Sequence, residues 1–406
     1  MTRRRVLITG MGAVTAAGLG VPALWRAARD GVSQVVPLNL ANPVRNNIRI
    51  GAQFRDFAPA DHIEASILPF CDRFTQFALV AGDEAMAQAG LPRGERLGLR
   101  TATIIGTGIG GAETIETGIH NAYVTNTRVD PWSVPRLMPN AAASQLSARY
   151  GAMGPSFAVS SACSSGAQAI GIGAHFIRAG LVDRAIVGGA EACMTGSGMK
   201  SWEALRVLSP DLCRPFSKDR NGMVLGEGAA VFVLESEEAA EQRGATGLAE
   251  FLGYGTSSDA SDIVRPDSTG AAYALSGALA DAGIGPEDID YINAHGTGTL
   301  ANDTTETAAL KATFGEALAR IPVSSTKPIH GHGLGAAGAI ELAVTLMALR
   351  DDIVPPTINW RVVDPRCELD CVPEGARAKT IKTAMSNSFA FGGINAVLIV
   401  AKAGKA

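Results

Sequence analysis

The sequence predicts an α/β protein made of two related halves. Short apolar runs alternate along the chain with longer helical patterns, which is typical of strand–helix–strand units. This alternation has a similar rhythm on either side of residue 250, so we predict one half over residues 1–250 and a second over residues 251–406. Gly accounts for 47 of the 406 residues and only 18% of residues are charged, which favours a large core of closely packed strands and helices.

The first half carries predicted strands at residues 5–10, 102–106, 156–159 and 184–188, and predicted helices at residues 72–89, 141–150 and 164–179. The first strand follows a basic start that a signal peptide could also have. We favour a strand, because the apolar run is short, leads into Gly-rich loop residues and has no convincing cleavage site.

The second half repeats this scheme. Strands are predicted at residues 249–253, 291–294, 322–325, 382–386 and 396–401, and helices at residues 270–282, 303–314 and 336–350. No short repeat, low-complexity tract or disordered linker interrupts the two halves. We therefore expect two related αβ layers packed together.

Composition excludes several classes of function. The net charge is −4 and there is no long basic run, so we expect no nucleic-acid partner. No uncharged apolar stretch reaches the ~18 residues of a membrane span. The six cysteines form neither a metal-type pair nor a dense secreted framework. We interpret them as reduced thiols of a cytoplasmic protein.

Cys163 is the candidate nucleophile. It follows a predicted strand and three small residues, and a Gly/Ala/Ser-rich helix begins directly after it. The partial positive charge at a helix N-terminus favours the thiolate, which is the reactive form. The arrangement is analogous to the nucleophile elbow of serine hydrolases. The alternative is an inert buried thiol. We favour that alternative for the remaining cysteines, which are Cys71, Cys193, Cys213, Cys367 and Cys371.

Basic side chains follow two predicted strands of the second half. His295 stands at a strand end before a Gly/Thr turn, and Lys327, His330 and His332 follow the next strand. The carboxyl ends of strands are where α/β proteins gather their ligands. Three basic side chains within six residues indicate a site that holds or creates negative charge. A surface lysine and structural histidines are the alternatives.

A fourth segment, residues 387–395, contains Gly392 and Gly393. The backbone N–H groups of this pair could donate to an oxyanion. The segment also has the composition of a tight turn between strands, and we expect it to be both.

One reaction needs a cysteine, two histidines and a lysine together. A metal site is a poor fit, because His295 and His332 come from separate segments without a carboxylate cluster. A cysteine protease uses one histidine and an orienting Asn or Asp, and has no use for a second His beside a Lys. Carbon–carbon bond formation on thioesters uses all four groups. The cysteine carries an acyl group, and two imidazoles stabilise the enolate formed as malonate loses its carboxylate.

At these four segments the sequence resembles the elongating β-ketoacyl–acyl carrier protein synthases (synthases I and II). The resemblance covers essentially the whole chain and includes residues 104–111 (IIGTGIGG), 214–222 (RPFSKDRNG) and 225–228 (LGEG). It implies a thiolase-like α-β-α-β-α fold, an obligate homodimer and chain elongation in fatty acid or specialised lipid or polyketide synthesis. The phosphopantetheine arm of acyl carrier protein would carry the substrates, and the enzyme itself would bind no cofactor.

The resemblance also implies catalytic roles. Cys163 would accept the acyl chain. His295 and His332 would bind the malonyl thioester oxygen and promote decarboxylation. Lys327 would tune the site electrostatically, paired with Glu306.

Further roles concern substrate binding. Phe391 would act as a gate, and its backbone N–H would form the oxyanion hole together with that of Cys163. Ile109 would line the acyl pocket, and Thr297 and Thr299 would touch the pantetheine arm. Phe389 and Gly392 complete the expected substrate-binding residues.

Three positions depart from the family pattern. Synthase II proteins usually carry Gly where Ala390 stands and Thr where Ile394 stands, and His330 replaces a small hydroxyl residue. A Cβ at position 390 narrows the conformations open to the gating loop. Together with residues 202–208 (WEALRVL), Ala390 resembles a specialised branch that includes the nodulation-type ketosynthases.

Acyl carrier proteins are strongly acidic, so a basic patch must dock them. The candidates are Lys200, Arg206, Arg214 and Arg73, and Arg206 matches a carrier-contacting arginine of synthase II. Solvated surface charge is the alternative for each.

Other enzymes fit less well. A thiolase would need a second catalytic cysteine near the C-terminus, where residues 387–395 contain none. An initiating synthase of the third type would pair its cysteine with His and Asn. A non-catalytic chain-length factor would lack the nucleophile, and it remains the alternative from a different class, as a subunit of a ketosynthase heterodimer.

Overall fold

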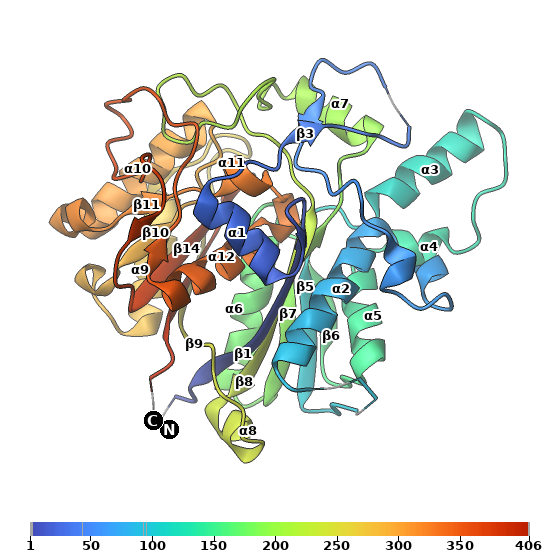
Figure 1. Cartoon of the computed structure of the whole chain (residues 1–406), viewed down its shortest axis with the longest axis horizontal. Helices are drawn as coiled ribbons and strands as arrows, with labels where there is room; N and C mark the ends of the chain where they lie inside the picture. The colour runs from blue at the N-terminus through green and yellow to red at the C-terminus, as the bar shows by residue number, and fades with distance from the viewer. Residues whose placement is uncertain (1–2, 43, 92, 95, 405–406) are drawn as a thin grey trace.

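One continuous sheet runs through both halves of the chain (Figure 1). The computed structural model describes residues 3–404 except residues 43, 92 and 95. The sheet strands of the first half are β1 (Val6–Thr15), β2 (Gly18–Leu19), β5 (Thr101–Gly106), β6 (Ser156–Val159), β7 (Arg184–Glu191) and β8 (Gly228–Ser236). Those of the second half are β9 (Ala249–Ser258), β10 (Tyr291–Asn293), β11 (Val323–Ser324), β14 (Thr383–Ala390) and β15 (Ile394–Lys402).

The two halves repeat the same strand pattern. In the first half β5 is parallel to β6 and β7, and β8 is antiparallel to β7 and β1. In the second half β10 is parallel to β11 and β14, and β15 is antiparallel to β14 and β9. The halves join where β1 pairs with β9. This repeat supports a division near residue 250, which stays a prediction.

Helices form three layers around these strands. The helices of the described residues are α1 (Val21–Asp30), α2 (Arg73–Gln88), α3 (Ala112–Tyr123), α4 (Ser133–Leu137), α5 (Ala141–Tyr150), α6 (Ser165–Arg178), α7 (Gly196–Ala204), α8 (Glu237–Gln242), α9 (Ser268–Ala282), α10 (Leu300–Phe314), α11 (Lys327–His330) and α12 (Ala337–Asp351). Helices α6 and α12 contact each other and strands of both halves, whereas α2 and α5 cover the first half and α9 and α10 the second. The layers follow the predicted α-β-α-β-α order.

The central position of α12 follows from its sequence. Its residues are apolar around the whole circumference, and the side chains from Ala337 to Leu349 are buried. A helix that is hydrophobic on all sides belongs in a core. Glu341 is the exception, because it places a carboxyl group in this apolar layer.

The first half differs from our predictions in several elements, including helices α1, α3 and α7, which were not predicted. The first strand continues to Thr15, through residues that we interpreted as Gly-rich loop. A Cβ at Gly10 or Gly12 would lie 2.1 or 2.0 Å from a carbonyl oxygen of α2, so these glycines serve close helix–strand packing instead of a turn. The strand β8 was not predicted.

Two short hairpins, β3 (Val36–Pro37) with β4 (Ile50–Gly51) and β12 (Ile353–Val354) with β13 (Arg377–Ala378), lie outside the main sheet. Within the described part of the chain, every helix is too short or too polar to cross a bilayer.

Candidate active site

Cys163 occupies a tight turn between a strand and a helix. Strand β6 ends at Val159 and helix α6 begins at Ser165, as predicted. Ala162 has a φ of 50°, a left-handed conformation that is costly for a residue with a Cβ. The strained turn presents Cys163 at the helix N-terminus, where its side chain is buried at 3% exposure.

The structure brings His295, His332 and Lys327 to this thiol. The Nε2 atom of His332 lies 3.2 Å from the Sγ atom of Cys163. The two imidazole rings have centroids 5.3 Å apart, and Lys327 Nζ lies 3.3 Å from His295 Nδ1. The histidines and the lysine follow β10 and β11, which are parallel neighbours, so their carboxyl ends meet at one edge of the sheet.

Hydrogen bonds define the tautomers of both imidazoles. The backbone N–H of Leu334 donates to His332 Nδ1 at 3.3 Å, and the Lys327 ammonium donates to His295 Nδ1. A neutral imidazole accepts at one nitrogen and donates from the other, so both rings carry their hydrogen on Nε2. Burial, with the charge of Lys327, lowers the pKa of each histidine well below its ordinary value. Both are therefore neutral N–H donors at pH 7.

The same tautomers argue against a metal centre. Cys163, His295 and His332 place one potential ligand atom each within 4.8 Å of one another, although the two histidines come from separate segments. A metal ligand needs a free lone pair, and here the lone pairs are on Nδ1 and already accept hydrogen bonds. The neighbouring Lys327 ammonium also repels a cation.

Lys327 pairs with Glu341 and not with Glu306, so the predicted ion pair was wrong. The side chains of Lys327 and Glu341 are fully buried and in direct contact. Burial raises the pKa of Glu341 to about 7, and the charge of Lys327 opposes that rise. Glu341 lies on α12, whereas Glu306 lies on α10. A single carboxylate within an otherwise apolar helix is the signal that could have identified it.

Glu306 instead holds the backbone of the catalytic loop. Its carboxylate accepts the N–H groups of His295 and Gly296, each at 2.8 Å. Asp303, one turn earlier on α10, accepts the N–H of Phe216 at 2.8 Å and that of Gly298 at 3.2 Å. These contacts set the direction in which the His295 ring projects.

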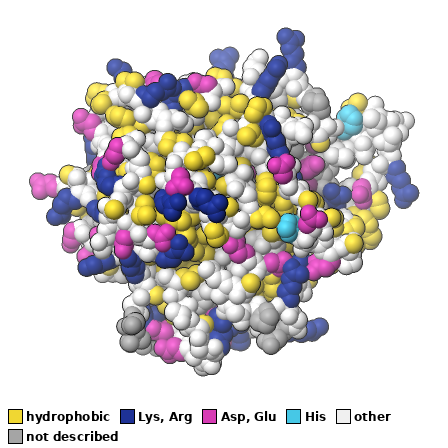
Figure 2. All heavy atoms as spheres, viewed as in Figure 1, with side chains coloured by type: hydrophobic (Ala, Val, Ile, Leu, Met, Phe, Trp, Pro, Cys, Tyr) yellow, Lys and Arg dark blue, Asp and Glu magenta, His cyan; other side chains and the backbone are white. Residues whose placement is uncertain are grey.

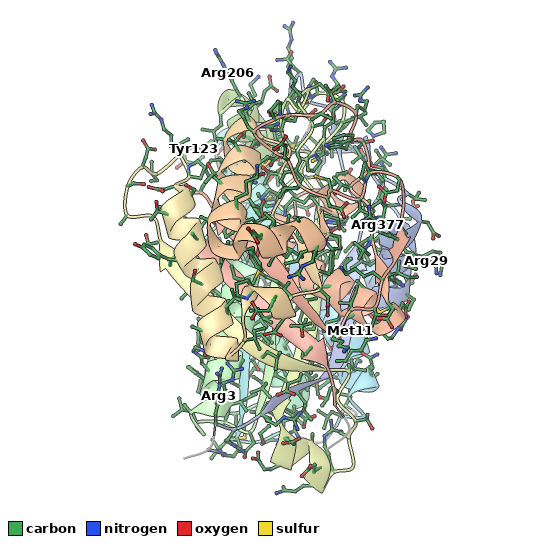
Figure 3. The ribbon with its side chains drawn as sticks, turned by 90° about the vertical axis from the view of Figure 1, so that its left-hand side faces the viewer. Arg3, Met11, Arg29, Tyr123, Arg206 and Arg377 are labelled. Carbon is green, nitrogen blue, oxygen red and sulfur yellow. The ribbon has the colours of Figure 1, made fainter. Side chains whose placement is uncertain are left out.

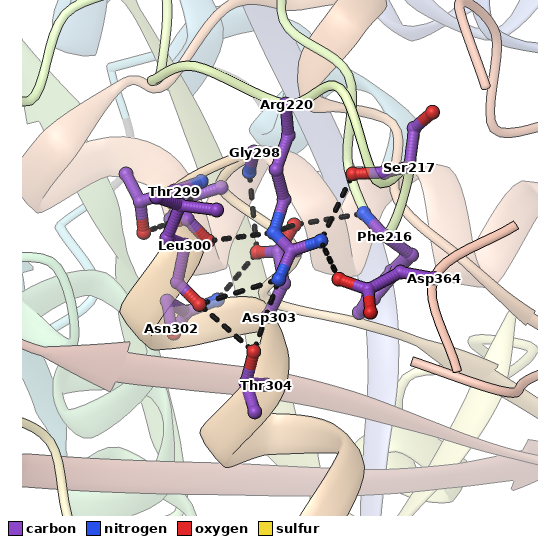
Figure 4. A network of polar contacts seen from close by, with 12 residues as sticks. Phe216, Ser217, Arg220, Gly298, Thr299, Leu300, Asn302, Asp303, Thr304 and Asp364 are labelled. Carbon is purple, nitrogen blue, oxygen red and sulfur yellow. Dashed lines mark hydrogen bonds and ion pairs between the residues drawn. The ribbon is translucent and has the colours of Figure 1, made fainter. Parts of the chain in front are cut away.

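Arg220 stabilises this arrangement, as Figure 4 shows. Its guanidinium lies 3.7 Å from Asp303 and 2.6 Å from Asp364, and all three side chains are buried. It also donates to the backbone oxygen of Thr299 at 3.2 Å. Because Arg220 belongs to the first half and Asp303 to the second, the network ties the two halves together beside the site.

Two expectations need correction: that the helix N-terminus makes Cys163 a thiolate, and that the N–H groups of the glycine pair are free for an oxyanion. Burial raises the pKa of the Cys163 thiol to about 11, although Lys327 and the N–H of Phe391 lower it, so the helix N-terminus alone does not yield a thiolate. The N–H groups of Gly392 and Gly393 donate to the carbonyl oxygens of Ile263 and Ala390 at 2.9 and 3.1 Å. The glycine pair is therefore occupied in the turn.

A cavity leads from the surface to these side chains. Among the predicted residues, it is lined by Cys163, His295, His332, Thr297, Thr299, Phe389, Phe391 and Gly392. Lys327 and Glu306 lie behind the cavity wall and act through His295. Ile109 lies outside the lining, on the turn after β5, and is 41% exposed.

The four candidate docking residues fall into two groups. Lys200 and Arg206 are exposed, and Arg206 projects into solvent in Figure 3. Arg73 donates to Glu227 at 2.6 Å beneath the surface, and Arg214 is 5% exposed and paired with Asp211. Arg73 pairs with the buried Glu227 and Arg214 is itself buried, so their low exposure disfavours carrier docking, which stays a prediction for both.

Comparison with known proteins decides the family. The family described as "Beta-ketoacyl synthase, N-terminal domain" matches residues 3–240, and "Beta-ketoacyl synthase, C-terminal domain" matches residues 248–361. The chain belongs to the β-ketoacyl synthase family.

Relatives of this β-ketoacyl synthase match over nearly their whole length. Nodulation protein E of Rhizobium sp. (strain N33) is 45% identical over 397 residues, covering 97% of this chain and 98% of the relative. The 3-oxoacyl-[acyl-carrier-protein] synthase 2 of Staphylococcus aureus (strain COL) is 41% identical over 408 residues, covering 98% of each. The solved ishigamide ketosynthase/chain length factor is 35% identical with a TM-score of 0.94, covering 99% of this chain and 100% of that one. The thiolase-like fold and the resemblance to nodulation-type ketosynthases are thereby confirmed.

Proposed function

We propose that this synthase catalyses decarboxylative condensation of an acyl thioester, held on Cys163, with malonyl carried by acyl carrier protein. The products are a 3-oxoacyl thioester on the carrier and CO₂. The observation that supports this best is the pair of neutral Nε2–H donors, from His295 and His332, beside one cysteine thiol. Two fixed donors suit an oxygen that gains negative charge.

In the first half-reaction the Cys163 sulfur attacks the carbonyl carbon of the acyl thioester. The carrier thiol leaves with a proton, and the acyl group becomes a thioester of Cys163. The negative oxygen of the intermediate would accept hydrogen bonds from the N–H groups of Cys163 and Phe391. The backbone N–H of Phe391 lowers the pKa of the Cys163 thiol, which supports a place for this donor beside the sulfur.

In the second half-reaction the malonyl thioester oxygen would accept the Nε2–H groups of His295 and His332. The bond to the carboxylate breaks, CO₂ leaves, and its electron pair forms an enolate. The enolate carbon attacks the acyl thioester and expels the sulfur of Cys163, which regains a proton. Lys327 would keep His295 in the donating tautomer throughout.

Phe391 is proposed to gate the entry of malonyl. Its ring lines the cavity, and its centroid lies 6.0 Å from that of Trp202. The Cβ of Ala390 restricts the loop that would carry this movement. Thr297 and Thr299, whose hydroxyls lie 2.9 Å apart on the cavity wall, are proposed to contact the pantetheine arm. The enzyme itself is proposed to bind no cofactor.

The test uses malonyl-carrier protein and a panel of acyl-carrier proteins from two to eighteen carbons. We expect intact-mass spectrometry to show a two-carbon gain on the carrier-bound chain for at least one acyl length. A reaction without malonyl-carrier protein is the control. If no donor acylates Cys163, the catalytic proposal fails and the chain-length-factor role becomes the leading one. The intact nucleophile and its partners disfavour that role.

Carrier docking is proposed for the surface around Lys200 and Arg206. Basic and acidic side chains are interspersed over the face in Figure 2, and the net charge is −4. An acidic carrier must therefore be held by local cations and not by a broad positive field. A location in the cytoplasm stays a prediction.

A homodimer is proposed through α3 and α4. Large apolar side chains stand exposed there, including Tyr123 at 85%, Val124 at 70% and Val134 at 63%, and Tyr123 lies at the periphery in Figure 3. Exposed apolar clusters of this kind mark protein interfaces. Ile109 lies on the turn leading into α3, so the partner would cover it.

Light scattering should give twice the 41.9 kDa chain mass, falling to the monomer value in a Tyr123→Glu/Val124→Asp variant. Leu99→Asp, which alters an equally exposed apolar residue elsewhere, should leave the mass unchanged. A monomeric wild-type protein would contradict the proposal.

A further inference from the structure

We propose that Arg265, at the rim of the active-site cavity, binds the phosphate of the phosphopantetheine arm and so helps to select substrates. This inference rests on the proposed function, and it assigns a role to a residue that lies on a loop far from the catalytic segments in the sequence.

Arg265 is distinguished by its charge. Of the described side chains that line the cavity, it is the one that is charged at neutral pH, because His295 and His332 are kept neutral. The cavity is lined by no carboxylate among the described residues. A negatively charged group entering this cavity therefore has one fixed cation to meet.

The groups along the cavity follow an order. Cys163 and the histidines are buried at its inner end. Thr297, at 5% exposure, and Thr299, half-buried, offer hydroxyls farther out. Arg265 and Ala301 are exposed at the outer end.

A phosphopantetheine thioester has a matching order. Its reacting thioester lies at one end, two neutral amides lie in the middle, and a single anionic phosphate lies at the other end. With the thioester at Cys163 and the amides near the two threonine hydroxyls, the phosphate reaches the exposed end. Arginine suits this role, because its planar guanidinium can donate two hydrogen bonds to one phosphate.

The loop that carries Arg265 is held against the active-site turn. The N–H of Gly392 donates to the carbonyl of Ile263 at 2.9 Å, and Asn395 donates to Asp259 at 2.7 Å. These bonds join the loop to the β14–β15 turn and to β15, so the position of the rim is set by the core sheet. A fixed rim allows one cation to select a ligand at a defined depth.

The Arg265 guanidinium is available for a ligand. Asp262, on the same loop, accepts the backbone N–H groups of Val264 and Arg265 at 2.7 and 3.0 Å. Its carboxylate thereby caps the loop backbone. Among the described residues the guanidinium itself has neither a hydrogen bond nor an ion pair.

The experiment compares two donors that differ only in the phosphate, acyl-4′-phosphopantetheine and acyl-pantetheine, together with the acyl-carrier protein. The measured quantity is kcat/KM for acylation of Cys163, and intact-mass spectrometry measures the acylated fraction over time. We expect Arg265→Gln to lower kcat/KM for the phosphorylated donor about five- to tenfold, with little change for acyl-pantetheine. The effect should shrink in high salt, since exposed charges are screened.

Two further variants serve as controls. Arg265→Lys keeps the charge but not the paired donors, so it should recover part of the loss. Arg26→Gln removes an exposed arginine of α1, away from the cavity, and should behave as wild type.

Each other result overturns the proposal. An equal loss for both small donors would mean that Arg265 shapes the loop without binding phosphate. A loss confined to the carrier-bound donor would mean that Arg265 contacts the surface of the carrier protein and not the phosphate. If wild-type Cys163 is acylated by no donor at all, the proposed function itself fails, whereas acylation at equal rates by both small donors removes only the role of Arg265.

Discussion

Replacing Cys163 by alanine is expected to abolish acyl transfer and condensation while malonyl decarboxylation continues. Replacing His332 by alanine is expected to suppress decarboxylation, and condensation with it, while acylation of Cys163 continues. Cys163 supplies the only covalent bond to the acyl chain in the proposed reaction. His332 supplies an N–H to the enolate oxygen, and losing one such donor lowers a rate by about 10²–10³. Acylation of Cys163 should remain detectable in His332→Ala, because the proposed donors to its oxyanion, the N–H groups of Cys163 and Phe391, are unchanged.

The two half-reactions can be measured separately. Intact-mass spectrometry follows the acyl group on the protein, and release of labelled CO₂ from malonyl-carrier protein follows decarboxylation. Cys71→Ala, which removes another buried thiol outside the cavity, should retain both activities. Undiminished decarboxylation in His332→Ala would rule out the role assigned to that imidazole.

Replacing Lys327 by methionine should affect both stability and catalysis. It leaves Glu341 buried without its partner, and breaking a buried ion pair costs about 3–5 kcal/mol of unfolding free energy. It also removes the donor to His295 Nδ1, so the ring can change tautomer and decarboxylation should fall by about 10² or more.

A double variant separates the two effects. Lys327→Met with Glu341→Leu replaces the ion pair by apolar groups and should recover most of the stability in urea unfolding. Decarboxylation should stay low, because His295 still lacks its donor. Recovery of activity together with stability would show that Lys327 serves folding alone.

The stability of Lys327→Met should also depend on pH. Burial raises the folded-state pKa of Glu341 above its unfolded value, and without Lys327 nothing opposes that rise. A raised carboxyl pKa contributes stability that is present at low pH and lost as the pH rises through the folded pKa. The variant should therefore be closer to wild type at pH 5 than at pH 8, and an equal deficit at both would contradict this account.

Most secondary structure could be predicted because it depends on local patterns. The predicted helix at residues 141–150 coincides with α5, and the strand at residues 156–159 coincides with β6. The pattern failed at Gly12, where a glycine that looks like loop material lets α2 approach the strand closely. Sequence periodicity cannot distinguish a loop glycine from a strand glycine that allows close packing, since it contains no information on what packs against a residue from elsewhere in the chain.

The residue types and their neighbours alone determined the chemistry. A cysteine at a strand-to-helix turn and two histidines and a lysine at strand ends limit the reactions that the protein can perform, and these side chains do converge. Tertiary structure decided how they are used. It gave Lys327 its partner on α12, set the tautomers of both imidazoles and occupied the N–H groups of the glycine pair. It also left Arg73 and Arg214 less exposed than Arg206, which the sequence could not distinguish from them. Each of these depends on a contact between segments far apart in the chain, where burial and hydrogen bonding, not residue type, determine the charge and direction of a group.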